Sequence, residues 1–166
     1  MAKKPLTYEN ALARAANLCA RAEHCRFEIT SKLRQWGVGE QDAAKILDWL
    51  EDGGFINEER FALSFTHDKY RFEGWGRTKI RYTLRRYGIG DAAVQAAFQE
   101  IDENEYAAIL RTLLETKARH SAETDPYKKK ASLFRYAMSR GYESALISKI
   151  VSGLVSGADD FEVEEE

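Results

Sequence analysis

Two stretches of this chain repeat each other 51 positions apart, the interval from Leu33 to Leu84. Residues 26–39 read RFEITSKLRQWGVG and residues 77–90 read RTKIRYTLRRYGIG. Identical residues coincide when the two are aligned: Arg26 with Arg77, Ile29 with Ile80, Leu33 with Leu84, Arg34 with Arg85, Gly37 with Gly88 and Gly39 with Gly90. Such self-similarity is typical of proteins that stack one small unit several times, because each unit buries its apolar face against its neighbours.

The apolar residues in both stretches recur with the period of an α-helix. Positions i, i+4 and i+7 are occupied by Ile29, Leu33 and Trp36 in the first stretch and by Ile80, Leu84 and Tyr87 in the second. This spacing places each trio on one stripe that faces a core. A glycine follows each stripe and favours the left-handed conformation in which helices end. Sustained alternation of apolar and polar residues is missing, and the pattern therefore predicts an all-α fold.

Each helix–turn–helix pair is preceded by a longer predicted helix with its own cap. Thr7, Asn57 and Asp102 are suitable capping residues, and Glu105, three residues after Asp102, predicts a reciprocal capping box. A weaker third copy places Gly141 in the position of Gly88, and Asp125 with Pro126 begins its middle helix.

The sequence thus predicts three tandem three-helix repeats, elongated and curved. We expect them over residues 7–56, 57–101 and 102–156, followed by an acidic disordered tail at residues 157–166.

Residue types with metal or catalytic chemistry are sparse. Cys19 and Cys25 stand six residues apart, on different faces of a helix, so we interpret them as reduced packing residues. The three histidines have no acid–base partner at a useful spacing, and neither a nucleophile motif nor a phosphate loop occurs. We expect no catalytic residue, metal or cofactor. The chain also has no apolar run long enough for a membrane span or secretory signal, which favours the cytoplasm.

Cations gather on the second repeated stretch. With the apolar stripe turned to the core, Arg77, Arg81 and Arg85 line up on one flank as a cationic ridge, and Lys79 and Arg86 lie on the other flank. Arginines at helical spacing favour recognition of carboxylates or phosphates, whereas a solvated helix face is the plainer interpretation. On either interpretation the ridge is exposed, and reversing its three charges is expected to leave stability nearly unchanged.

Other cations are candidates for the same role. Arg34 is the first-repeat counterpart of Arg85, and Lys128, Lys129 and Lys130 open a predicted helix, where cations oppose the helix dipole. Either the acidic tail or a nucleic-acid phosphate would compensate these lysines, and the sequence does not choose between them.

Three segments together resemble the RecX family of recombination regulators. They are RAEHCRFEITSKL at residues 21–33, GFINEERFALSF at residues 54–65 and WGRTKIRYTLRRYGI at residues 75–89. The resemblance implies three tandem three-helix units and binding to the RecA recombinase filament on DNA, with inhibition of filament growth, ATP hydrolysis and strand exchange. Direct contact with single-stranded or duplex DNA stays open, as does the choice between filament ends and groove. We expect a monomer.

Two functions from other classes remain. A stand-alone nucleic-acid binder of helix-turn-helix type would explain the basic helix before each glycine turn, but the helix that would enter the groove is rich in acids. A purely structural helical adaptor would leave the cationic ridge without a function. Salt dependence separates the two, because phosphate binding weakens steeply as salt rises.

Overall fold

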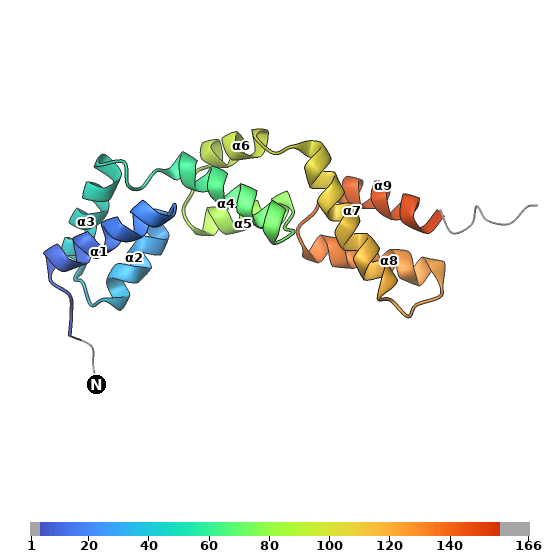
Figure 1. Ribbon diagram of the computed structural model, residues 1–166, viewed down its shortest axis with the longest axis horizontal. Helices are drawn as coiled ribbons and strands as arrows, with labels where there is room; N and C mark the ends of the chain where they lie inside the picture. Colours follow the sequence, from blue (N-terminus) through green and yellow to red (C-terminus); the bar gives the residue numbers. More distant parts are fainter. Residues whose placement is uncertain (1–3, 157–166) are drawn as a thin grey trace, which may run out of the picture. The chain divides into compact units, whose positions relative to one another are not determined.

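The computed structural model describes residues 4–156 of the 166-residue chain. Over that range it contains helices and no strand, as Figure 1 shows. The helices are α1 (Tyr8–Arg21), α2 (Arg26–Gln35), α3 (Glu40–Asp52), α4 (Glu58–Phe72), α5 (Arg77–Arg86), α6 (Asp91–Gln99), α7 (Glu103–Arg119), α8 (Pro126–Ser139) and α9 (Ser144–Ser156). The all-α fold class is therefore confirmed. The acidic tail, with its expected disorder, lies outside the described residues.

Four helices begin at the residues that the sequence nominates as caps. Each cap accepts a hydrogen bond from a backbone N–H of the first turn: Thr7 for α1, Asn57 for α4, Asp102 for α7 and Asp125 for α8. Such a bond satisfies donors that have no partner within the helix. The predicted capping box at α7 is wrong in one respect, because the carboxylate of Glu105 accepts hydrogen bonds from Tyr70 and Arg71 instead.

The middle helix of every repeat is followed by a glycine with positive φ. Gly37, Gly88 and Gly141 have φ values of 75°, 77° and 90° after α2, α5 and α8. L-residues with a side chain rarely adopt this conformation, so glycine is the natural residue at these helix ends. The two glycine stops predicted in the repeated stretches are thus confirmed, and the weaker third copy has the same device.

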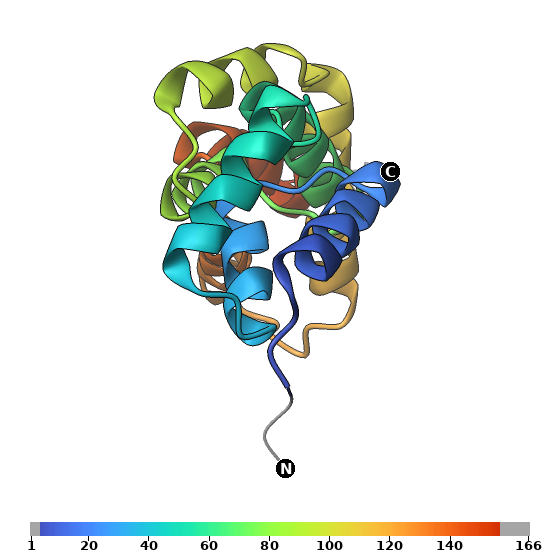
Figure 2. The same ribbon diagram turned by 90° about the vertical axis from the view of Figure 1, so that its left-hand side faces the viewer.

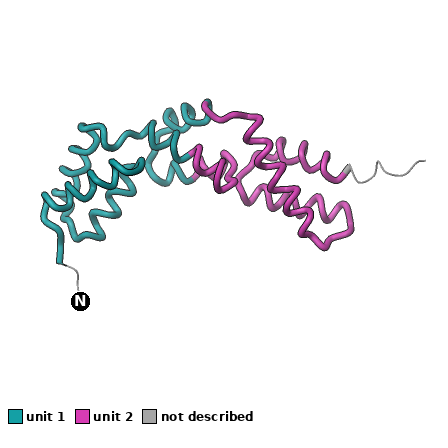
Figure 3. The backbone as a smooth tube through the Cα atoms, viewed as in Figure 1, with its two compact units in different colours: residues 1–65, 83–99 teal, residues 66–82, 100–166 magenta. Residues whose placement is uncertain are grey.

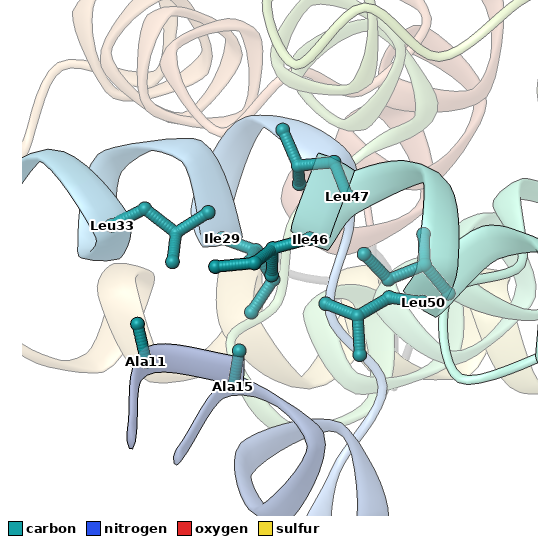
Figure 4. Close-up of a cluster of buried hydrophobic side chains, with 8 residues drawn as sticks. Ala11, Ala15, Ile29, Leu33, Ile46, Leu47 and Leu50 are labelled. Carbon is teal, nitrogen blue, oxygen red and sulfur yellow. The ribbon is translucent and has the colours of Figure 1, made fainter. Parts of the chain in front are cut away.

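The first three helices enclose an apolar core. Ile29 and Leu33 of α2, Ile46 and Leu50 of α3, and the small side chains of α1 form one buried cluster, drawn in Figure 4. Figure 2 shows these three helices, dark blue to teal, at the front of the view. The predicted core residue Trp36 packs against the cluster but is only partly buried, with the Arg14 guanidinium 4.6 Å from its ring centre.

The chain divides into two compact units, which Figure 3 colours separately. Unit 1 comprises residues 1–65 and 83–99, and unit 2 comprises residues 66–82 and 100–166. Helices α1, α2 and α3 pack against one another in unit 1, and α7, α8 and α9 do so in unit 2. The second repeat is shared, because α4 and α5 each contribute one part to either unit.

Candidate partner-binding surface

Helix α5 carries the cations that the sequence nominates as a binding ridge. The structure separates them into two groups with different surroundings. Arg77 and Lys79, on the first turn, lie against other parts of unit 2, whereas Arg85 and Arg86, on the last turn, are exposed on unit 1. Arg81 lies between the groups and is partly buried. Arg81 and Arg86 also take part in interactions within the chain.

Arg77 is held inside unit 2 by two carboxylates and an aromatic ring. Its guanidinium forms an ion pair with Glu143 at 3.0 Å and another with Glu103, and it lies 4.3 Å from the centre of the Tyr106 ring. Only 18% of its side chain is exposed. Desolvation by itself would lower the pKa of the Arg77 guanidinium. Its acidic partners outweigh that effect, so the pKa is raised above its usual value. The predicted exposure of the ridge is therefore wrong for Arg77, which packs against residues of the third repeat.

The start of α5 is joined to the turn between α8 and α9. Gly76 N–H donates to the carbonyl of Arg140 at 2.8 Å, and Thr78 N–H donates to the carbonyl of Gly141 at 3.0 Å. A Cβ on Gly76 would lie 2.3 Å from the backbone of Gly141, a distance that side chains do not tolerate. Two glycines thus let two turns from different repeats approach through their backbones.

Three buried tyrosines continue this contact through unit 2. The rings of Tyr70, Tyr106 and Tyr142 follow one another, with centroids 6.1 Å and 5.2 Å apart. The Tyr106 hydroxyl accepts the N–H of Arg77 at 2.9 Å and donates to Glu143 at 2.7 Å, while that of Tyr70 donates to Glu105 at 3.0 Å. Burial above all, and then hydrogen bonding to a carboxylate, raises the pKa of Tyr70 and of Tyr106.

Lys79 also has a partner inside unit 2. Its ammonium lies 4.2 Å from the centre of the Trp75 ring, and the ammonium of Lys69 lies 4.7 Å from the same centre. Lys69 is in turn paired with Glu73 at 2.6 Å. A cation over an indole is attracted by the negative face of the ring. Lys79 and Trp75 are both partly buried, so this lysine is positioned by its own unit.

The last turn of α5 presents its cations to solvent. Arg85 Nε lies 3.1 Å from Asp91, and the side chains of this pair are 59% and 71% exposed. Ion pairs so exposed contribute little to stability, typically about 0 to 1 kcal/mol. Arg34 on α2, the first-repeat counterpart of Arg85, is exposed as well. We call Arg34, Arg85 and Arg86 the exposed arginines.

The lysine cluster lies near the start of α8, at its third to fifth residues. Lys128 is exposed, and Lys129 and Lys130 are partly buried. The Asp125 carboxylate at the cap accepts from the N–H of Tyr127 at 2.9 Å, which places one anion at this helix end. The acidic tail, one of the two groups that the sequence offers as compensation for these lysines, lies outside the described residues.

Sequence reasoning missed the residues that hold Arg77. Glu103, Tyr106 and Glu143 lie in the next repeat, 26 to 66 residues further along the chain, where a helical wheel of α5 cannot reveal them. One signal was available, since the position that Gly76 occupies in the second repeat holds Cys25 in the first. A glycine at that position indicates close backbone approach.

Other kinds of site find no support among residues 4–156. No group of three or more His, Cys, Asp and Glu side chains in this range is arranged to hold a metal ion. Cys19 and Cys25 are free thiols there. Within the described part of the chain, each helix is too short or too polar to cross a bilayer.

Comparison with family models identifies all three repeats. The model described as the first three-helix domain of RecX matches residues 11–50, the second matches residues 57–97, and the third matches residues 103–151. The matched ranges follow one another in family order and cover most of the chain. The boundaries that we derived from the sequence stay a prediction.

Whole-chain relatives agree with the family models. The chain is 32% identical to the regulatory protein RecX of Pseudomonas putida over 84% of this chain and 87% of the relative. It is 33% identical to that of Pseudomonas syringae pv. tomato over 88% and 91%. A crystal structure of RecX from Lactobacillus salivarius has a TM-score of 0.73 at 21% identity, covering 89% of this chain and 96% of that one, and so shows the same fold. This protein belongs to the RecX family.

Proposed function

We propose that this protein binds the filament that the RecA recombinase forms on DNA, and that it restrains the filament's extension, ATP hydrolysis and strand exchange. The observation that carries the proposal is the tandem match of three RecX domain models along the chain. The identification of RecA as the partner rests on the resemblance to the RecX family. Repeated helical units suit a periodic partner, because similar surfaces recur along both molecules.

Within this proposal, the exposed arginines and the lysine cluster contact the filament. Arg34 and Arg85 occupy equivalent positions of two repeats, so a repeating partner meets the same guanidinium twice. Guanidinium groups bind carboxylates and phosphates through paired hydrogen bonds, which suits either recombinase side chains or DNA. Arg81, which is partly buried, is a further candidate for contact with the filament. Arg77 and Lys79 are assigned to structural roles within unit 2, because Glu103, Glu143 and the Tyr106 ring contact Arg77 and the Trp75 ring contacts Lys79.

The test is DNA-dependent ATP hydrolysis by RecA from the same source. Inhibition is expected at substoichiometric amounts of this protein, because one molecule lodged on a filament blocks exchange of many subunits. Full hydrolysis in the presence of equimolar protein would overturn the proposal. We further propose that the protein acts as a monomer in the cytoplasm. Its effect on RecA requires no catalytic activity of its own.

The helix-turn-helix alternative is less well supported, because α3, the helix that would enter a DNA groove in the first repeat, is rich in acids. The exposed acids of α3 include Glu40, Asp42, Asp48 and Glu51, and the last two form ion pairs with Arg26. Such a helix would repel the phosphates that flank a DNA groove. Binding to bare duplex DNA with a steep salt dependence, together with no effect on RecA, would favour this alternative.

A further inference from the structure

Unit 2 contains a cavity of about 440 Å³ at the end where α7 and α8 are joined. Pro126 and Leu133 of α8 and Leu154 and Val155 of α9 supply its apolar wall. Its volume lies within the range of clefts that bind side chains or small ligands. Figure 1 shows the first turn of α8 and the last turn of α9 at the same end of the unit.

The chain leaves the described structure at this cavity. Leu154 and Val155 are among the last described residues, and the sequence continues from residue 157 as GADDFEVEEE. Phe161 follows Val155 by six residues, and an extended chain spans roughly 3.3 to 3.6 Å per residue, or about 20 Å in all. The segment 157–166, which we call the tail, is therefore long enough to bring Phe161 back to the cavity.

The surroundings of the cavity are complementary in charge to the tail. Lys129 contributes to the cavity lining, and Lys128 and Lys130 are its neighbours in sequence near the start of α8. Two carboxylates lie nearby: Glu123, which accepts the N–H of Asp125 at 3.0 Å, and Asp125 itself at the cap. Three ammonium groups against two carboxylates, at a helix end that already disfavours cations, leave an excess of positive charge.

The tail combines apolar and acidic residues in the matching order. Phe161 and Val163 alternate with Glu162 and Glu164, and Asp159 and Asp160 precede them. In an extended backbone, alternate side chains point to opposite sides. Phe161 and Val163 would then share the side toward an apolar wall, with the glutamates on the other side and the aspartates beside the entrance.

We propose that the tail folds back on its own chain, with Phe161 in this cavity and its acids paired with Lys128, Lys129 and Lys130. The contact offsets the unfavourable placement of three lysines at a helix N-terminus and covers apolar wall that otherwise faces water. An anionic partner of the lysine cluster must displace the tail. The contact lies within one chain, so it stands or falls independently of the proposed function.

The experiment compares methyl NMR spectra of the full chain and its Phe161→Ala variant. The methyl resonances of Leu133, Leu154 and Val155 are expected to shift when the phenyl ring is removed, because ring currents act only on nearby groups. A chain that ends after Ser156 should give the same shifted positions. A matched control exchanges Phe161 and Glu166, which keeps composition and charge and should also give the shifted positions.

Two further arms test the charges and the source of the ring. Lys128→Glu with Lys130→Glu in the full chain should move the three resonances toward their tail-free positions. A peptide of residues 157–166, added at about millimolar concentration to the chain that ends after Ser156, should restore the original positions. Superimposable spectra of the full chain and Phe161→Ala would overturn the proposal. Shifts that depend on protein concentration would also overturn it, since they would indicate a second copy as occupant.

Discussion

The guanidinium of Arg77 lies 4.3 Å from the centre of the Tyr106 ring, and the backbone N–H of Arg77 donates to the hydroxyl of the same tyrosine. One residue of the second repeat thus contacts one side chain of the third repeat twice, through its cation and through its backbone. Glu143 completes the arrangement, because it pairs with the guanidinium and accepts the tyrosine hydroxyl. A residue that sequence reasoning assigns to partner recognition is a structural element of unit 2.

Replacing Arg77 by alanine is expected to lower the free energy of unfolding by about 2 to 3 kcal/mol, because Glu103 and the partly buried Glu143 lose charged hydrogen bonds. The Arg85→Ala variant is the matched control. It loses an exposed ion pair with Asp91 and should change stability by less than about 1 kcal/mol. Urea denaturation of both variants gives the comparison. Equal stability of the two would contradict the structural role of Arg77.

Alanine at Gly76 should be destabilising by at least about 1 to 3 kcal/mol, because its Cβ would meet the Gly141 backbone at 2.3 Å and force two turns apart. Gly153→Ala is the control. Gly153 lies in α9, and a Cβ there meets nothing within 4 Å, so this substitution should stabilise by about 0.5 to 1 kcal/mol. In thermal unfolding, the melting temperature should therefore fall for Gly76→Ala and rise for Gly153→Ala.

Reversing the charges of Arg34 and Arg85, both exposed, should abolish most of the inhibition of RecA ATP hydrolysis while leaving the fold intact. Loss of charged contacts at an interface costs on the order of 2 kcal/mol each, which corresponds to more than a hundredfold weaker binding for two. Arg111→Glu with Arg135→Glu makes the same change of net charge at exposed positions of α7 and α8. Full inhibition by the first double variant, or equal loss in both, would assign the contact elsewhere.

Alkaline pH should destabilise the fold, partly through Cys25. Burial raises the pKa of this thiol from 9.0 to about 11, and the charge of Glu28 adds to the effect. The folded state thus holds the proton more tightly than the unfolded state, so the thiol's contribution is complete below pH 9 and is lost as pH rises toward 11. The slope from one thiol is at most about 1.4 kcal/mol per pH unit. Urea denaturation between pH 8 and 11 should show a shallower fall in the Cys25→Ala variant.

Local chemistry explains what the sequence could predict. A helix cap needs only a side chain two or three residues from the N–H that it satisfies, and a helix end needs only a glycine, so Asn57, Asp125 and Gly88 were identifiable from short windows. The repeat added long-range information, because matched apolar positions in two copies must face equivalent cores. Ile29 and Ile80 are both fully buried, as the match predicts.

Contacts between repeats are what the sequence could not predict. The helical wheel of α5 correctly separates its apolar stripe from its flanks, but a flank is either solvent or the next repeat, and only the fold decides which. Arg77 meets Glu103 and Glu143 on its flank, whereas Arg85, two turns later, is exposed. Glu105 shows the same limitation, since Tyr70 and Arg71 of the preceding repeat bind the carboxylate that the capping rule assigns to its own helix.

The joined turns also bear on the order in which the protein is made. The three backbone N–H groups at the start of α5, from Gly76, Arg77 and Thr78, donate to Arg140, Tyr106 and Gly141, all of which a ribosome adds later. At roughly 5 to 20 residues per second, the Arg140 carbonyl is made about 3 to 13 seconds after the Gly76 N–H that it accepts. Until residues 140 and 141 are made, the N–H groups of Gly76 and Thr78 lack these carbonyl acceptors, so the second repeat of a nascent chain is completed only when the third has emerged.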